Sequence, residues 1–168
     1  MKAFLILEDG TVFEGTSIGS QKEVISEIVF NTSMTGYLEV MTDPSYAGQA
    51  VVMTYPLIGN YGITPDAESK RPWVDGYIVR ELSRMPSNFR CEGTIQDFLK
   101  ENDIPGIAGI DTRALTKILR DKGTMNGMIT TDEQYELEKV LPRLKEYQTG
   151  NVVDKVTCDE TVSYTHLR

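Results

Sequence analysis

Three side chains of the kinds used in catalysis by a cysteine nucleophile occur in the sequence: Cys91, Cys158 and His166. A cysteine nucleophile needs a nearby base, usually histidine, that converts its thiol into a thiolate. The single histidine is the third residue from the end of the sequence, a position that is commonly frayed. Neither cysteine stands in a glycine-flanked turn, and the GxSxG motif of serine hydrolases is absent. We therefore expect no catalytic residue in this chain.

Metal and phosphate chemistry find equally little support. Histidine and cysteine are too few for a transition-metal site, and the carboxylates fall singly at turns and helix starts, where capping explains them. The glycines form neither GxGxxG nor a P-loop. Two cysteines in unrelated contexts give no disulfide framework, so we expect reduced thiols. The sequence predicts no metal and no cofactor in this chain.

Two polar segments stand between apolar runs of strand type: "NTSMTG" at 31–36 and "TDPSY" at 42–46. Short hydroxyl side chains and a glycine in the first segment permit another backbone to approach closely. The second segment is typical of a type I turn, with Asp43 at its first position and Pro44 at its second. Taken alone, these residues favour a structural role, because turn serines commonly bond their own backbone.

The totals limit the kinds of partner. The 168 residues suit one compact domain, and 40% hydrophobic residues suffice for a normal core. The net charge of −8 argues against nucleic acid, and the basic residues between Arg113 and Lys122 are typical of a solvated helix face. No apolar run approaches the roughly 18 residues of a membrane span, and the start of the chain does not resemble a signal peptide. We expect a cytoplasmic protein that binds neither membrane nor nucleic acid.

The polar segments 31–36 and 42–46 must be held by neighbouring elements, and in the first half of the chain these are mainly predicted strands. Residues 3–13 indicate a hairpin that turns at Asp9-Gly10. Further strands are predicted within 23–31, 49–56 and 72–82. In the strand within 23–31, we expect Val24, Ile28 and Phe30 to share one face.

In the second half the period changes to that of helices. Thr94 and Asp97 have the spacing of a capping box for a helix within 92–103, and a short buried strand is expected in 104–110. Asp111 is a predicted N-cap for a helix that ends at Gly123. Farther along the chain, we expect a strand in 126–131 and a last helix over 132–147 that is bent or broken at Pro142. One α/β domain follows, rich in strands at the start and with its helices late.

Five blocks of sequence carry a resemblance to a known family: "LEDGTVFEG", "FNTSMTGY", "TDPSY", "SNFR" and "GIDTR". In this order they resemble the amino-terminal domain of the small subunit of carbamoyl phosphate synthetase, over nearly the whole chain. The resemblance implies a three-layer β/β/α domain of the swivelling type over residues 1–158. Residues 159–168 would be a tail, either a truncated linker or an artefact, because "VSYTHLR" does not continue the family's pattern.

The resemblance also implies a division of labour. In complete family members, a C-terminal glutaminase domain with cysteine, histidine and glutamate hydrolyses glutamine, and ammonia passes through a tunnel to the large subunit. The large subunit uses ATP, magnesium and bicarbonate to make carbamoyl phosphate for arginine and pyrimidine synthesis. The implied partners are therefore the large subunit, the missing glutaminase domain and glutamine, and this chain alone should be inactive.

Four residues acquire roles through the resemblance. Ser45 matches a serine that touches the bound glutamine, and Ser33, Met34 and Thr35 become candidates for the tunnel mouth or the subunit interface. A different class of protein stays open beside this interpretation: a free-standing, non-catalytic binding or scaffold module with the same fold. A hydrolase that relies on Ser45 alone is disfavoured, because no base is available near it.

Overall fold

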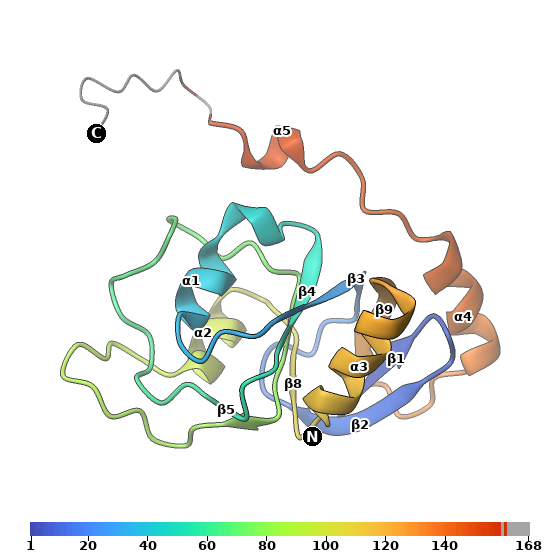
Figure 1. Ribbon diagram of the computed structural model, residues 1–168, viewed down its shortest axis with the longest axis horizontal. Helices are drawn as coiled ribbons and strands as arrows, with labels where there is room; N and C mark the ends of the chain where they lie inside the picture. The colour runs from blue at the N-terminus through green and yellow to red at the C-terminus, as the bar shows by residue number, and fades with distance from the viewer. Residues whose placement is uncertain (159, 161–168) are drawn as a thin grey trace.

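The protein is described here by a computed structural model that places residues 1–158 and residue 160 (Figure 1). The tail expected at 159–168 lies outside the described residues except for Glu160, and so does His166. Whether residues 1–158 form the unit implied by the resemblance stays a prediction. Within the described part of the chain, no helix combines the length and the apolar character needed to cross a membrane.

Seven strands close into a barrel, in the order β1-β2-β8-β6-β4-β3-β9. The strands β3, β4, β6 and β8 run parallel to their neighbours within this set, whereas β1, β2 and β9 complete the barrel with antiparallel pairs. A separate pair, β5 and β7, is parallel. The bounds are β1 (Lys2–Leu7), β2 (Val12–Ser17), β3 (Val24–Asn31), β4 (Gln49–Met53), β5 (Leu57–Ile58), β6 (Gly76–Ile78), β7 (Glu81–Leu82), β8 (Gly106–Ala108) and β9 (Met125–Thr130).

The predicted hairpin is confirmed, and its turn explains its register. Asp9 Oδ1 accepts the Thr11 N–H at 2.8 Å, and Gly10 adopts a φ of 87°, as a tight turn requires. Leu5 then lies opposite Phe13 in the antiparallel pair. On its other edge β1 pairs with β9, so that the two strands of the hairpin form part of the barrel wall.

Helices connect the strands and pack against both faces of the barrel sheet (Figure 1). The segment between β3 and β4 contains α1 and a short 3-10 helix, and α3 connects β8 to β9. The bounds are α1 (Tyr37–Thr42), η1 (Pro44–Tyr46), α2 (Ile95–Glu101), α3 (Thr112–Lys122), α4 (Leu137–Glu146) and α5 (Val153–Val156). The predicted α/β class, with a strand-rich first half and helices mainly later, is confirmed.

Both predicted helix caps are confirmed. The Thr94 hydroxyl accepts the Asp97 N–H at 3.1 Å at the start of α2. Asp111 Oδ1 accepts the Ala114 N–H at 3.0 Å at the start of α3. The helix α3 ends at Gly123, whose φ of 91° favours glycine. Local sequence therefore determines where these two helices begin.

The core has two main parts, one on each side of the sheet. One part packs α3 against the barrel strands, and the other packs α1 and α2 against them. The first contains Leu5, Ile28, Val52, Ile107, Leu115 and Leu119; the second contains Tyr37, Met41, Val51, Tyr77, Ile95 and Leu99. The helix α1, which begins at the tyrosine of "NTSMTGY", is thus part of the core, although no helical period is visible in the sequence there.

Two details of the prediction are wrong. The last helix begins at Leu137 rather than near Asp132, because Asp132 Oδ1 accepts the Gln134 N–H at 2.8 Å and holds a turn. The helix continues through Pro142, so of the two alternatives predicted there the break is wrong and the bend stays a prediction. Phe30 lies on the alternating face expected for it, but it is 36% exposed because β3 leaves the core near its end.

Candidate functional site

Ser45 lies in the short helix η1, in a turn whose backbone is fixed. Asp43 Oδ1 accepts the Ser45 N–H at 2.8 Å, and the Asp43 carbonyl accepts the Tyr46 N–H at 3.1 Å. Pro44 supplies the φ that the second turn position needs. The turn predicted from "TDPSY" is therefore confirmed.

The hydroxyl of Ser45 is exposed and makes no hydrogen bond to any part of the chain that the structure describes. Its backbone N–H, not its side chain, holds the turn. The structural role considered for this serine thus belongs to Asp43, which accepts the bond. A hydroxyl that can donate and accept is left available on a fixed backbone.

Ser33, Met34 and Thr35 are all exposed in the segment between β3 and α1. Met34 is 66% exposed, so it does not have the packing role that a methionine usually has. The position of these residues fits a surface that another molecule or domain could cover. Their expected role at a tunnel mouth or interface stays a prediction.

Asn31, at the end of β3, connects the two polar segments. Its Nδ2 donates to the Tyr46 hydroxyl at 3.0 Å, and its Oδ1 accepts the Ser33 N–H at 2.8 Å. One amide side chain therefore bonds both the turn that carries Ser45 and the segment that carries Ser33. The role of Asn31 is not predicted from the sequence, where its only local signal is an amide residue followed two positions later by a serine, the spacing of an Asx turn.

The start of α1 is held by a pair of tyrosines. Gly36, the N-cap, has a φ of 82°, and its N–H donates to the Tyr61 hydroxyl at 2.8 Å. The Tyr37 N–H donates to the same hydroxyl at 3.3 Å. The Tyr37 hydroxyl in turn accepts the Tyr61 N–H at 3.0 Å and donates to the Gly62 carbonyl at 3.1 Å. This tyrosine clamp, formed by Tyr37 and Tyr61, fixes the exit of the 31–36 segment.

Burial raises the pKa of the phenols of Tyr37 and Tyr61, so both remain neutral hydrogen-bonding groups near neutral pH. Burial also raises the pKa of Tyr77, a fully buried core residue whose hydroxyl has no partner among the described residues. Tyr37, Tyr61 and Tyr77 therefore form a cluster of uncharged aromatic rings with three hydroxyl groups in the core next to α1.

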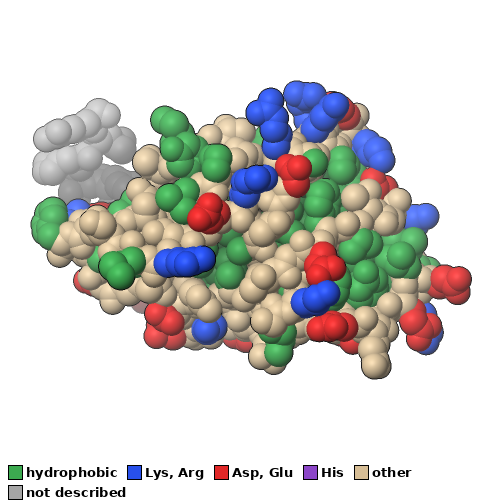
Figure 2. Space-filling model, turned by 90° about the horizontal axis from the view of Figure 1, so that it is seen from below, with side chains coloured by type: hydrophobic (Ala, Val, Ile, Leu, Met, Phe, Trp, Pro, Cys, Tyr) green, Lys and Arg blue, Asp and Glu red, His purple; other side chains and the backbone are tan. Residues whose placement is uncertain are grey.

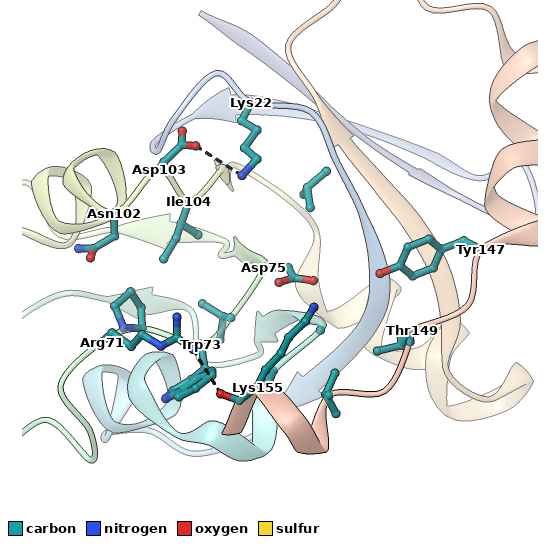
Figure 3. A pocket seen from close by; sticks show the side chains of 17 residues that line it. Lys22, Arg71, Trp73, Asp75, Asn102, Asp103, Ile104, Tyr147, Thr149 and Lys155 are labelled. Carbon is teal, nitrogen blue, oxygen red and sulfur yellow. Dashed lines mark hydrogen bonds and ion pairs between the residues drawn. The ribbon is translucent and has the colours of Figure 1, made fainter. Parts of the chain in front are cut away.

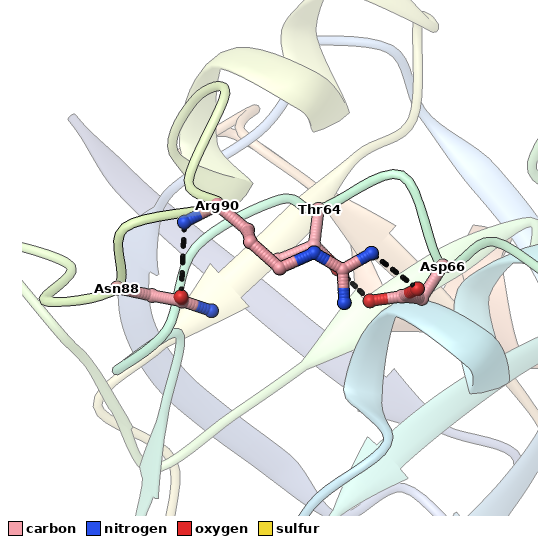
Figure 4. A network of polar contacts seen from close by, with 4 residues as sticks. All are labelled: Thr64, Asp66, Asn88 and Arg90. Carbon is pink, nitrogen blue, oxygen red and sulfur yellow. Dashed lines mark hydrogen bonds and ion pairs between the residues drawn. The ribbon is translucent and has the colours of Figure 1, made fainter.

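The "SNFR" motif forms a network of polar contacts (Figure 4). Arg90 Nη2 lies 2.7 Å from Asp66 Oδ1, and the Arg90 N–H donates to Asn88 Oδ1 at 3.0 Å. The Thr64 hydroxyl adds a 3.2 Å bond to Asp66 Oδ2. Phe89, between Asn88 and Arg90, is 98% exposed.

A separate cavity of about 310 Å³ lies beneath the segment that follows α4 (Figure 3). Asp75 faces it and accepts a 3.2 Å hydrogen bond from the Ser26 hydroxyl. Burial raises the Asp75 pKa, against the Ser26 bond and the charges of Lys155 and Lys22, which lower it. None of the four residues predicted for the site lines this cavity.

Both cysteines carry free thiols. The Cys91 thiol donates to the Gly93 carbonyl at 3.3 Å, and Cys158 is exposed. Among the residues that are placed, no group of three or more His, Cys, Asp or Glu side chains could hold a metal ion. The arrangement at Ser45 can therefore bind a polar ligand through hydrogen bonds, and the described residues present no assembled nucleophile and base there.

Comparison with known proteins gives the family. The family model described as "Carbamoyl-phosphate synthase small chain, CPSase domain" matches residues 5–129. The carbamoyl phosphate synthase small chain of Clostridium perfringens is 56% identical over 161 residues, which are 95% of this chain and 46% of the relative. The small chain of Syntrophotalea carbinolica is 50% identical over 169 residues, covering 98% of this chain and 45% of the relative.

A third relative, the carbamoyl phosphate synthase small chain of Oceanobacillus iheyensis, is 57% identical over 145 residues, or 86% of this chain and 39% of the relative. The chain thus spans less than half the length of each of these three relatives. The match nonetheless includes all four residues predicted for the site, within 5–129. The chain belongs to the carbamoyl-phosphate synthase small chain family, through the domain that this family model describes.

Proposed function

We propose that this chain is the amino-terminal part of a glutamine-hydrolysing carbamoyl phosphate synthase small subunit and supplies one wall of its glutamine site. Ser45 is the residue that contacts glutamine. The observation that carries the proposal is the exposed Ser45 hydroxyl, which has no partner in the described chain and sits on a turn fixed by Asp43. Family membership supports the reaction class.

The role assigned to Ser45 is to bind glutamine through hydrogen bonds, not to attack it as a nucleophile. A serine hydroxyl can donate to a carboxylate and accept from an ammonium group, and an α-amino acid such as glutamine carries both. A fixed turn lowers the entropy lost when the ligand is bound. The attacking thiolate would come from a C-terminal glutaminase domain, for which the relatives have room, since more than half of each lies outside the match.

The neighbouring segment would serve the next step. Ser33, Met34 and Thr35 would lie where ammonia leaves the glutamine site, or where the large subunit docks. Their exposure, together with the short side chains of Ser33 and Thr35, supports a surface on which two domains close tightly. The large subunit would use ATP and magnesium to make carbamoyl phosphate in the cytoplasm, for arginine and pyrimidine synthesis. The three-layer swivelling arrangement of the fold belongs to the same proposal.

A test of the division of labour is an ammonia assay on the purified chain with glutamine. We expect no release above the uncatalysed rate, because the described residues hold no thiolate with a base beside Ser45. A parallel assay uses the chain joined to a family glutaminase domain, where release is expected. Turnover by the chain alone that Ser45→Ala abolishes would contradict the proposal.

A further inference from the structure

A cleft of about 960 Å³ lies beside α3, away from the tyrosine clamp. Its lining is rich in positive charge and in threonine hydroxyls: Arg80, Arg113, Lys117, Arg120, Thr32 and Thr54. The sequence predicted a merely solvated face for α3, and its basic side chains are indeed exposed. In the structure these side chains line the cleft together with Thr32, Thr54 and Arg80, which come after β3, β4 and β6.

Three of the cations form a regular row. Arg113, Lys117 and Arg120 are separated by four and three residues, the spacing that places side chains on one face of a helix. With a rise of 1.5 Å per residue, the row is about 10 Å long. Arg80 comes from the segment after β6 and adds a fourth charge to the same cleft.

Among the described residues, one carboxylate, that of Asp111, lines this cleft beside the four cations. Arg80, Arg113 and Lys117 form no ion pair within the described residues, and Arg120 contacts only the adjacent Asp121, at 3.2 Å and exposed. Such an exposed pair contributes little. In a chain of net charge −8, this concentration of positive charge stands out, and Figure 2 shows Lys and Arg side chains gathered along the upper edge of one face.

The shape of the row favours separate carboxylates over a compact phosphate. Phosphate sites at helix starts use free backbone N–H groups. Here the start of α3 is occupied by the carboxylate of Asp111, which accepts the Ala114 N–H at 3.0 Å and would repel a phosphate. The cations are distributed along the helix instead of converging on one point.

We propose that this cleft docks an acidic segment of a partner protein, with carboxylates about one helical turn apart that pair with Arg113, Lys117 and Arg120. Complementary charge at such an exposed surface increases the association rate and fixes the register of the two surfaces. The inference does not depend on the glutamine role of Ser45, which lies in a different segment.

The test uses the full chain and a labelled, alanine-based helical peptide with glutamates at i, i+4 and i+7, followed by fluorescence anisotropy at low salt. A second peptide of the same composition has its glutamates distributed around the helix. We expect the in-phase peptide to bind more tightly and Lys117→Glu to weaken it at least about tenfold, since attraction becomes repulsion. Affinity should fall as salt is added.

Lys100→Glu is the matched control, because Lys100 is also an exposed helical lysine without an ion pair in the described residues. It should leave the affinity for the in-phase peptide within about twofold of the wild type, as expected for a distant exposed charge. An equal loss with Lys100→Glu, or equal affinity for both peptides, would show unspecific attraction and overturn the proposal. Tighter binding of inorganic pyrophosphate than of the peptide, lost in Lys117→Glu, would assign the cleft to phosphate and equally overturn it.

Discussion

The rings of Tyr37 and Tyr61 stack with their centroids 4.0 Å apart, and each hydroxyl accepts a backbone N–H from the other residue. The exchange ties the first residue of α1 to the loop that follows β5. Both residues lie far apart in sequence, so the pair forms only when the chain folds. The clamp therefore fixes the exit of the segment that carries Ser33, Met34 and Thr35.

Replacing Tyr61 by phenylalanine tests the clamp. The Gly36 and Tyr37 N–H groups would both lose their acceptor while the ring and its stacking remain. We expect the free energy of unfolding to fall by about 1–2 kcal/mol, the cost of leaving partly buried donors unpaired. Chemical denaturation of both proteins measures the difference.

Tyr55→Phe is the control, because Tyr55 is an exposed tyrosine with no hydrogen bond from its hydroxyl in the described residues. It should change the free energy of unfolding by less than about 0.5 kcal/mol. An equal effect of the two substitutions would mean that the clamp contributes nothing beyond ring burial.

Gly36→Ala should destabilise the protein through the backbone. Gly36 adopts a φ of 82°, where an L side chain costs about 1–2 kcal/mol. Gly150→Ala provides the comparison, because Gly150 has no positive φ and open space around it. Thermal unfolding should separate the two variants, and a Gly36→Ala protein as stable as Gly150→Ala would refute the strain.

Asn31→Leu should loosen both polar segments at once. It removes the donor to the Tyr46 hydroxyl and the acceptor of the Ser33 N–H while keeping the side-chain size. We expect the Ser33 amide to exchange its hydrogen about fivefold faster, the equivalent of about 1 kcal/mol. Asn31→Asp, which keeps the acceptor, should restore most of the protection. An unchanged exchange rate of the Ser33 amide in Asn31→Leu would show that the two hydrogen bonds of Asn31 do not hold the segments together.

The buried carboxyl of Asp75 predicts a pH dependence of stability. Burial raises its pKa in the folded state above the unfolded value, so its contribution is complete below the unfolded pKa of about 4 and is lost as pH rises through the folded pKa. Asp75→Asn should remove this dependence. The stability of the variant relative to the wild type should therefore rise between pH 3 and pH 7.

Urea unfolding over that range measures the effect, with Glu138→Gln as an exposed control on α4. The control should run parallel to the wild type. A constant difference between Asp75→Asn and the wild type at every pH would show that charge burial at Asp75 does not affect stability.

Sequence predicts the parts of this fold that depend on neighbours in the chain. The caps at Thr94 and Asp111 and the turn at Asp43 were predictable because each acceptor lies within three residues of its donor. The pairing that closes the barrel was not, because β1 meets β9 and β2 meets β8 across most of the chain. Such long-range register has no signature in local period.

The candidate site divides in the same way. The turn that holds Ser45 is predictable from the local motif "TDPSY", whereas the role of Ser45 comes only through the resemblance. The helix α1 has only six residues, too short for a clear period, and it depends on Tyr61, which is 24 residues from Tyr37. From the sequence, the cations at Arg113, Lys117 and Arg120 predict only a solvated helix face, because the opposite wall of the cleft, with Arg80, comes from another part of the chain.

The most direct test of the central claim compares two nitrogen sources in a complete carbamoyl phosphate synthase that contains this domain. With Ser45→Ala, carbamoyl phosphate formation from glutamine should fall by the equivalent of about 1–3 kcal/mol in kcat/KM, one hydrogen bond in a closed site. Formation from added ammonia should stay near the wild-type rate. Equal loss with both sources, or no loss with glutamine, would contradict the assignment of Ser45 to the glutamine site.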